Sequence, residues 1–175
     1  MNPPCIVLLV EDSRWTKTRG LRPRLKRAAA AALAQSGLKG KSSLTVLLAG
    51  DKKLQTLNHA FRGKDKPTNV LSFPAAANDF FDGSTAGRKT GKPLSLADAP
   101  RYRGDIAIAY GVTAKEAKEA GKTLADHATH LVVHGVLHLA GYDHERSRDA
   151  KIMEPLEVKI LAKLGIADPY KVSAS

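Results

Sequence analysis

Residues 134–144, HGVLHLAGYDH, predict the central helix of the fold and the site that it carries. His134 and His138 are four residues apart, so on a helix their imidazoles lie one above the other and can reach one metal ion. Gly141 is predicted to end the helix, because glycine accepts the positive φ that the following turn needs. That turn would bring His144 in from a third direction. The stretch therefore predicts a helix and turn that hold three imidazoles together.

Three neutral imidazoles that leave a fourth position to water are typical of a catalytic zinc site, whereas structural zinc sites are usually closed by four protein ligands. Cys5 is the only cysteine, which excludes a cysteine-rich structural site. The helix is otherwise apolar from Leu131 to Leu139, where a buried imidazole cluster without a ligand would be costly. A histidine pair at this spacing can arise by chance, but the glycine turn and the third histidine favour a metal site. Zinc is the expected ion, although other divalent transition metals, such as nickel, accept the same ligands.

His130 lies four residues before His134 on the same stripe, which leaves a second pairing open. These two could form the metal pair, but the glycine turn and His144 would then have no role. We therefore expect His130 to orient a ligand or to face the substrate. Asp143, next to a predicted ligand, and Asp105, at the head of a predicted strand, are candidates for orienting a histidine or for acting as a base. The general base is left unassigned.

A second segment, LNHAFRGKDKPTNVLSFP at residues 57–74, has the pattern of a helix end, a basic loop and a short strand. Arg62 carries a planar guanidinium that can bind two oxygens of a phosphate, and Lys64 and Lys66 add positive charge. A basic turn by itself is usually a solvated loop. If the segment faces the metal, Arg62 is the candidate catalytic residue and the two lysines are candidate substrate-binding residues.

The histidine spacing is also that of the metzincin zinc peptidases. In those enzymes a glutamate follows the first histidine and activates water, whereas this chain has Gly135 at that position. A zinc peptidase is therefore an alternative that lacks its main catalytic residue.

Together, the two segments resemble the YbeY family, bacterial metal-dependent endoribonucleases of ribosomal RNA maturation. The similarity is carried by FRGKDKPTNVLSFP at 61–74, GDIAIA at 104–109, HLVVHGVLHLAGYDH at 130–144 and a weaker tail at 164–170. The order of the segments is also the family's, and the histidine motif with GYDH is highly specific. Residues 13–41 and 75–103 look idiosyncratic, so any role placed there rests on charge alone.

The resemblance implies that His134, His138 and His144 are zinc ligands and that Arg62 faces the substrate. It implies a zinc-dependent, single-strand-specific endoribonuclease that acts in ribosomal RNA maturation, at the 3′ end of the small-subunit RNA, and in ribosome quality control. The expected partners are RNA, as a ribosomal RNA precursor, and the ribosome or its proteins. A ribosome-assembly factor that binds RNA without cleaving it is a further alternative.

The charge of the chain points to a polyanionic partner. Its 28 lysines and arginines against 17 acidic residues give a formal net charge of +11 and a pI near 9.9. Nine of these cations lie between Ser13 and Lys41, where no acidic residue occurs, and such a run favours nucleic acid or the ribosome. Aromatic residues make up only 5% of the chain, so the contacts are expected to be mainly to phosphate.

The sequence contains no apolar stretch long enough for a membrane span, and the short apolar run at residues 5–10 lacks the other features of a signal peptide. A single cysteine gives no disulfide framework. We expect a cytoplasmic protein with no membrane partner.

With 175 residues, of which 43% are hydrophobic, the chain fits one domain with a sizeable core. The expected class is α+β, a small mixed sheet of about four strands covered by helices, with the histidine helix central. Strands are expected at 6–11, 44–48, 69–73 and 104–110, and helices at 21–35, 51–61, 113–121, 123–140 and 147–164.

Three local patterns make this expectation specific. Thr113 and Glu116 form a capping-box pattern that predicts the start of one helix, and Thr123 is predicted to cap the histidine helix. Pro155 should kink the last helix or delay its start. Residues 75–103, rich in glycine, lysine and proline, are predicted to form a flexible insertion.

Overall fold

The computed structural model describes residues 3–75, 99–142 and 147–171, with side chains from 151 onward in the last range. The elements in chain order are β1 (Cys5–Val10), the 3-10 helix η1 (Ser13–Lys17), α1 (Leu21–Gln35), β2 (Ser42–Ala49), α2 (Asp51–Arg62), β3 (Val70–Pro74), β4 (Arg101–Ala109), α3 (Tyr110–Glu119), α4 (Leu124–Leu139) and α5 (Ser147–Lys163). The α+β class with a mixed sheet of four strands is confirmed.

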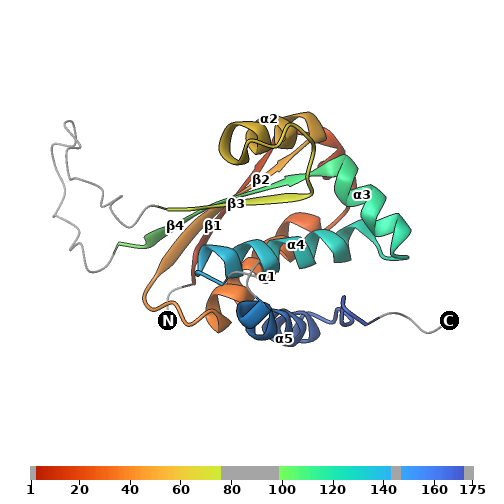
Figure 1. Ribbon diagram of the computed structural model, residues 1–175. Helices are drawn as coiled ribbons and strands as arrows, with labels where there is room; N and C mark the ends of the chain where they lie inside the picture. Colours follow the sequence, from red (N-terminus) through yellow and green to blue (C-terminus); the bar gives the residue numbers. More distant parts are fainter. Residues whose placement is uncertain (1–2, 76–98, 143–146, 172–175) are drawn as a thin grey trace, which may run out of the picture.

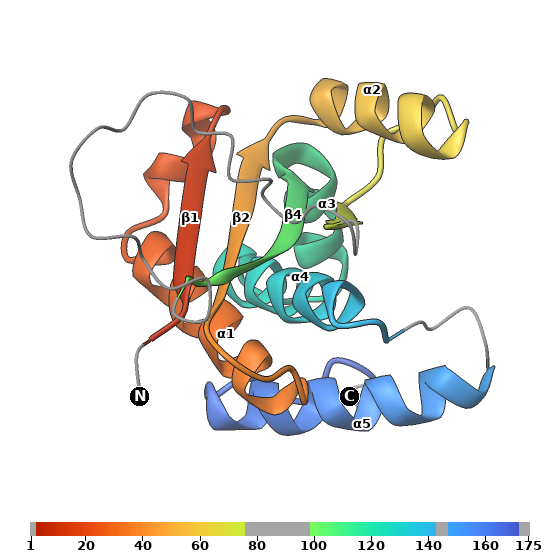
Figure 2. The same cartoon turned by 90° about the vertical axis from the view of Figure 1, so that its left-hand side faces the viewer.

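The strands of the sheet follow the order β1-β2-β4-β3. β1, β2 and β4 are parallel and lie side by side in Figure 2, and β3 pairs antiparallel with β4 as an outer strand. Val46 pairs with Ile106, and Leu71 pairs with Ala107. The strand that joins the parallel part to the antiparallel edge is therefore β4.

Helices cover the two faces of the sheet unequally. α2 packs on one face, and α1, α4 and α5 lie on the other (Figure 1). The larger core joins the helices of that second face to the strand side chains Leu44, Val46, Leu48, Ile106 and Ile108. The smaller core joins α2 to the other face through Ala49, Leu54, Leu71, Ala107 and Ala109. Because β4 is buried on both faces, it fixes α2 and α4 on opposite sides of one strand.

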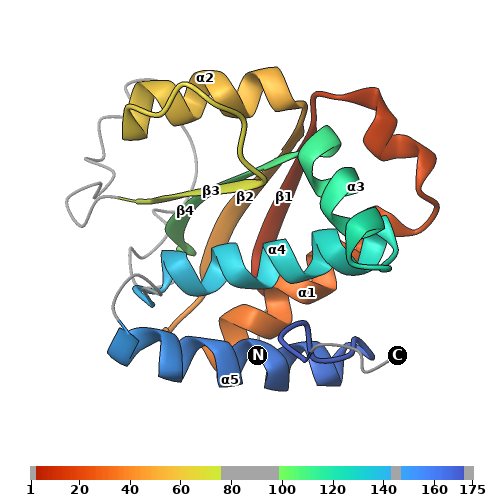
Figure 3. The ribbon, with the colours of Figure 1, turned by 45° about the vertical axis from the view of Figure 1, so that its right-hand side comes forward.

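α4 lies close to β4 because residue 135 has no side chain. A Cβ atom on Gly135 would lie 3.0 Å from Ile106 Cγ2 and 3.1 Å from Ile106 Cδ1. Figure 3 shows α4 directly below the sheet with α5 beneath it. Gly135 thus faces the sheet and sets the distance between the histidine helix and the sheet.

Both ends of α4 lie where the sequence predicts them. The hydroxyl of Thr123 accepts a hydrogen bond from Asp126 N at 3.1 Å and caps the start of the helix. After the C-cap residue Ala140, Gly141 has a φ of +99° and turns the chain away. α1 also spans the predicted residues.

The capping-box prediction for α3 is wrong. The helix begins at Tyr110, so Thr113 lies within it and is buried. The carboxylate of Asp51, the first residue of α2, accepts a hydrogen bond from Val112 N at 3.0 Å. The start of α3 is therefore capped by a residue 61 positions earlier in the chain, which no local pattern could reveal.

The last helix, α5, begins at Ser147 as predicted, with Pro155 inside it, so the proline does not delay its start. One further prediction needs correction. The insertion predicted at 75–103 ends earlier, because β4 begins at Arg101 and Arg103 is buried, where its Nε donates to Ser42 Oγ at 2.9 Å. Residues 76–98 of that insertion lie outside the described part of the chain. Among the described helices, none is long and apolar enough to cross a lipid bilayer.

Candidate active site

One face of α4 carries four histidines at successive helical turns. His127, His130, His134 and His138 all line a cleft of about 700 Å³. The spacing of three or four residues places them on a single stripe. The last three of these are predicted site residues, whereas His127 was missed, although it continues the same spacing by one step.

The opposite wall of the cleft comes from the end of α2, the loop after it and β3. Its lining residues are Arg62, Thr68, Asn69, Val70, Leu71, Ser72 and Pro74. Buried Asn58 holds the loop, because its Nδ2 donates to Lys66 O at 2.9 Å. The structure thus brings Arg62 and the histidines into one cleft, as predicted.

The imidazoles of His134 and His138 point toward each other through the same ring atom. Their Nε2 atoms are 3.0 Å apart. Two nitrogens bound to one zinc ion at about 2.0–2.1 Å in a tetrahedral arrangement are separated by about 3.3 Å. The observed separation is close to that value, so the pair is placed as two ligands of one ion would be.

The third predicted ligand, His144, and the neighbouring Asp143 lie outside the described residues. Within the described part of the chain, no three His, Cys, Asp or Glu side chains form a cluster suited to a metal ion. The described portion of the predicted site is therefore the His134 and His138 pair.

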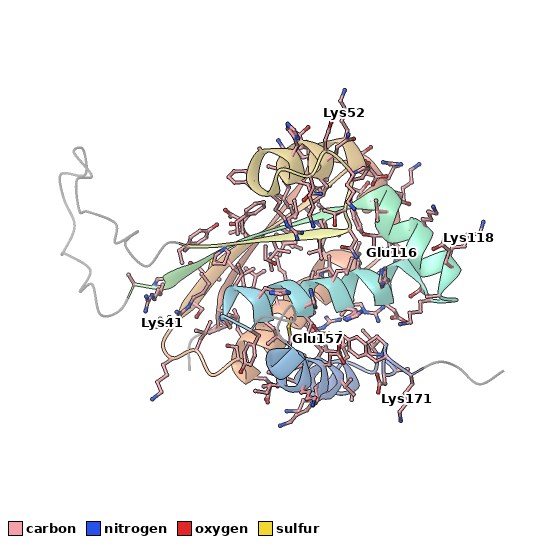
Figure 4. The ribbon with its side chains drawn as sticks, viewed as in Figure 1. Lys41, Lys52, Glu116, Lys118, Glu157 and Lys171 are labelled. Carbon is pink, nitrogen blue, oxygen red and sulfur yellow. The ribbon has the colours of Figure 1, made fainter. Side chains whose placement is uncertain are left out.

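A buried carboxylate on α5, which was not predicted from the sequence, contacts the histidine stripe. Glu157 is fully buried, and its Oε1 lies 2.5 Å from His134 Nδ1. Its Oε2 lies 3.1 Å from His130 Nε2 and also accepts a hydrogen bond from the Tyr170 hydroxyl. Figure 4 shows Glu157 between α4 and α5. Both oxygens of this carboxylate are thus bound by groups that line the cleft.

The charge of Glu157 is set by these contacts. Burial by itself would raise the pKa of this carboxyl, but hydrogen bonds from His130, His134 and Tyr170, with the charge of His134, lower it to about 2. Burial, and then the hydrogen bond to Glu157, raise the pKa of the Tyr170 hydroxyl. The pair therefore consists of an ionised carboxylate and a protonated phenol that donates to it.

His130 lines the cleft next to His134, and its role, to orient a ligand or to face the substrate, stays a prediction. Its Nε2 faces Glu157, and its ring packs edge-on against Tyr170 with 5.8 Å between centroids. Farther along the stripe, His127 Nε2 lies 2.7 Å from Glu116 Oε2, and Asn69 Nδ2 donates to the same carboxylate at 3.1 Å. Glu116 therefore links the loop wall of the cleft to the start of α4.

Three other predicted residues are not brought to the histidines. Lys64 and Lys66 are exposed on the loop after α2, and neither lines the cleft. Asp105 is exposed on β4, where its carboxylate accepts a hydrogen bond from the Tyr102 hydroxyl. An orienting role for Asp105 toward a metal ligand is not supported by this placement.

The basic run between Ser13 and Lys41 has mixed surroundings. Arg14 pairs with Asp12 at 2.6 Å, and Arg24 pairs with Asp126 at the start of α4. The outward face of the first two turns of α1 is exposed and carries Arg22, Lys26 and Arg27. The exposed positive charge of α1 is therefore concentrated in these three residues, while Arg24 joins α1 to the histidine helix.

Comparisons with known proteins agree on one family. A family model described as "Endoribonuclease YbeY" matches residues 10–165. Two curated proteins with that name are similar to the chain: one from Ruegeria pomeroyi, 47% identical over 93% of this chain and 96% of its own, and one from Chelativorans sp., 46% identical over 92% and 90%. The solution structure of TM1509 from Thermotoga maritima superposes with a TM-score of 0.55, at 25% identity, over 95% of this chain and 99% of that one.

Proposed function

The chain belongs to the YbeY family of endoribonucleases, and from that premise we propose that it hydrolyses single-stranded RNA in the cleft between β3 and α4, with a zinc ion held by His134, His138 and His144. We further propose that its substrate is a precursor of ribosomal RNA, cut at the 3′ end of the small-subunit RNA, and that it serves ribosome quality control on the ribosome in the cytoplasm.

The observation that carries the proposal is that Arg62 lines the same cleft as the histidine stripe, on the opposite wall. Among the described residues that line the cleft, Arg62 is the only arginine or lysine. A guanidinium binds two phosphate oxygens at once, which fixes the orientation as well as the position of a phosphodiester. A phosphodiester held by Arg62 would therefore present its phosphorus to the α4 wall.

The donor set fits a zinc ion. His134 Nδ1 is engaged by the Glu157 carboxylate, so the Nε2 that faces His138 is the nitrogen available to a metal. Two such nitrogens with the imidazole of His144 would form a three-histidine set, and that set leaves a position for water. When bound, the ion would lower the pKa of a water molecule and polarise a phosphoryl oxygen.

The residues of the chain would act around that chemistry. Arg62 would hold the scissile phosphate and stabilise the negative charge that develops on its oxygens during the reaction. Asn69, already bonded to Glu116, would keep the loop that follows Arg62 close to α4.

The size and charge of the surface support an unpaired RNA strand as substrate. An unpaired strand can bend its backbone into a cleft of about 700 Å³, whereas a double-stranded A-form helix is a stiff cylinder that is recognised by its shape. The exposed Arg22, Lys26 and Arg27 of α1 offer additional contacts to phosphates of a long RNA.

The zinc peptidase alternative is weakened further by packing. A glutamate at residue 135 would be needed to activate water, but that position faces the sheet, and a Cβ atom there would lie only 3.0 Å from Ile106. The side chain of any residue at position 135 would point at β4. A peptidase mechanism would therefore lack its water-activating glutamate on this helix.

A cleavage assay on a labelled RNA with one unpaired loop tests the proposal. We expect cutting in the loop, loss of cutting after treatment with a chelator, and its return when zinc is restored. A casein-type substrate incubated in parallel should remain intact. Binding without cutting under all metal conditions would favour the assembly-factor alternative, and cutting of casein would favour the peptidase.

A further inference from the structure

The fully buried carboxylate of Glu157 is the feature of this structure that the reaction does not explain. It lies on α5, apart from the helix that carries the histidines, and accepts hydrogen bonds on both oxygens. A buried charge costs free energy unless it is compensated by partners. The partners here are two histidines and a tyrosine, all of which line the cleft. The free-energy cost of burying this charge is therefore compensated by residues of the candidate site.

The contact with His134 decides which nitrogen of that ring carries hydrogen. An ionised carboxylate only accepts hydrogen bonds, so the 2.5 Å contact between Glu157 Oε1 and His134 Nδ1 requires a hydrogen on Nδ1. A neutral ring then has its lone pair on Nε2, which faces His138 Nε2 at 3.0 Å. The carboxylate therefore selects the tautomer that can bind a metal on the cleft side.

The other oxygen of Glu157 is fixed from the opposite direction. His130 Nε2 lies 3.1 Å from Oε2, and the Tyr170 hydroxyl donates to the same atom. Tyr170 comes from the segment after α5, so this contact ties the segment to the cleft. With both oxygens held, the carboxylate plane cannot rotate away from His134.

From this geometry we propose that Glu157 is a positioning residue, which holds His134 in the Nδ1–H tautomer and aims its Nε2 into the cleft, and that Tyr170 secures Glu157 in that role. The inference rests on the proposed function, since it assigns His134 to a metal ion. Carboxylates that orient metal-binding imidazoles typically change metal affinity by about 10–100-fold when they are removed.

The first test needs neither metal nor RNA. Long-range nitrogen–proton NMR spectra of the metal-free protein, recorded at about pH 8 where an ordinary imidazole is neutral, report the tautomer of each histidine. We expect the Nδ1–H form for His134 in the parent and a shift toward the Nε2–H form in Glu157→Leu. A parent spectrum with His134 as the Nε2–H tautomer would overturn the proposal.

The second test measures the zinc dissociation constant by competition with a chromophoric chelator. Glu157→Leu should bind zinc about 10–100-fold more weakly than the parent. Glu157→Gln should recover part of the loss, because its amide oxygen can still accept one hydrogen bond, and Tyr170→Phe should show a smaller weakening. Glu154→Gln, an exposed carboxyl on the same helix, is the matched control and should bind zinc as the parent does.

Thermal unfolding of each variant shows whether it is folded when its zinc affinity is measured. Parent-like zinc affinity in a folded Glu157→Leu would also refute the proposal. If Glu157→Leu does not fold, the parent tautomer and Tyr170→Phe still decide the matter. Failure of the RNA cleavage assay alone would refute the proposed function and leave these two measurements unaffected.

Discussion

Replacement of Arg62 by alanine should separate the binding of the phosphate from the binding of the metal. Arg62 is the last residue of α2 and is exposed, so its truncation opens no cavity in either core. Exposed substitutions of this kind usually change the free energy of unfolding by less than about 0.5 kcal/mol. Arg62→Ala should therefore keep the melting temperature and the zinc content of the parent.

The rate of RNA cleavage should fall much more. Arg62 is the only arginine or lysine among the described residues of the cleft, so no neighbouring lysine there can replace it. Removal of one preorganised donor to transition-state charge typically costs about 2.7–4 kcal/mol, or 10²–10³-fold in kcat. Arg62→Lys should recover only part of that loss, since an ammonium group lacks the two-point contact of a guanidinium.

The assay is single-turnover cleavage of a labelled, unpaired RNA by the zinc-loaded protein. Lys53→Ala is the matched control, because it removes one exposed cation from the first turn of the same helix and leaves the cleft untouched. It should cleave at close to the parent rate. If Arg62→Ala also cleaves at the parent rate, or no more slowly than Lys53→Ala, the role assigned to Arg62 is wrong.

Three other predictions concern the metal site, the basic surface and the buried carboxylate. His138→Ala should lose zinc in elemental analysis while His130→Ala keeps most of it; the opposite result would mean that the ligand set is wrong. Charge reversal at Arg22, Lys26 and Arg27 should weaken RNA binding, with Arg24 left intact because it pairs with Asp126. The slope of log binding constant against log salt concentration should become shallower by about 0.7 for each lost phosphate contact. An unchanged slope would exclude α1 from the RNA interface. Glu157 has a pKa of about 2 in the folded protein, against 4.5 as the ordinary value, so it stabilises the fold above pH 4.5 and this contribution is lost as the pH falls toward 2. Urea unfolding of the metal-free protein should therefore show a steeper loss of stability over that range for the parent than for Glu157→Gln, and parallel curves would contradict the assignment.

Local patterns predicted most elements because the responsible signals lie close together in the chain. The helix from Leu21 to Gln35 has its apolar stripe and its stop signals within a few residues, and Thr123 caps α4 through a contact three residues away. The start of α3 was misplaced because its cap, Asp51, comes from another helix. The strand order also depends on contacts between residues far apart in the chain, so local sequence patterns could not predict it.

The same distinction explains the site. His134, His138 and Arg62 could be predicted as site candidates because each belongs to a compact motif, whereas Glu157 has no motif around it. One signal was available: Glu157 lies four residues after Met153 and three before Ile160, both fully buried, so it interrupts the apolar stripe of α5. A charged residue on such a stripe indicates a buried partner. Only the three-dimensional structure shows which residues that partner comprises.

The position of β3 also has a consequence for self-association. An outer strand presents unpaired main-chain groups that can recruit a strand from another molecule and start aggregation. In the described sheet this strand is only five residues long and ends in Pro74, which has no N–H to donate. A short strand that ends in proline offers a neighbouring copy little main chain to pair with. Within the described residues, the edge of the sheet can therefore border the cleft without promoting self-association.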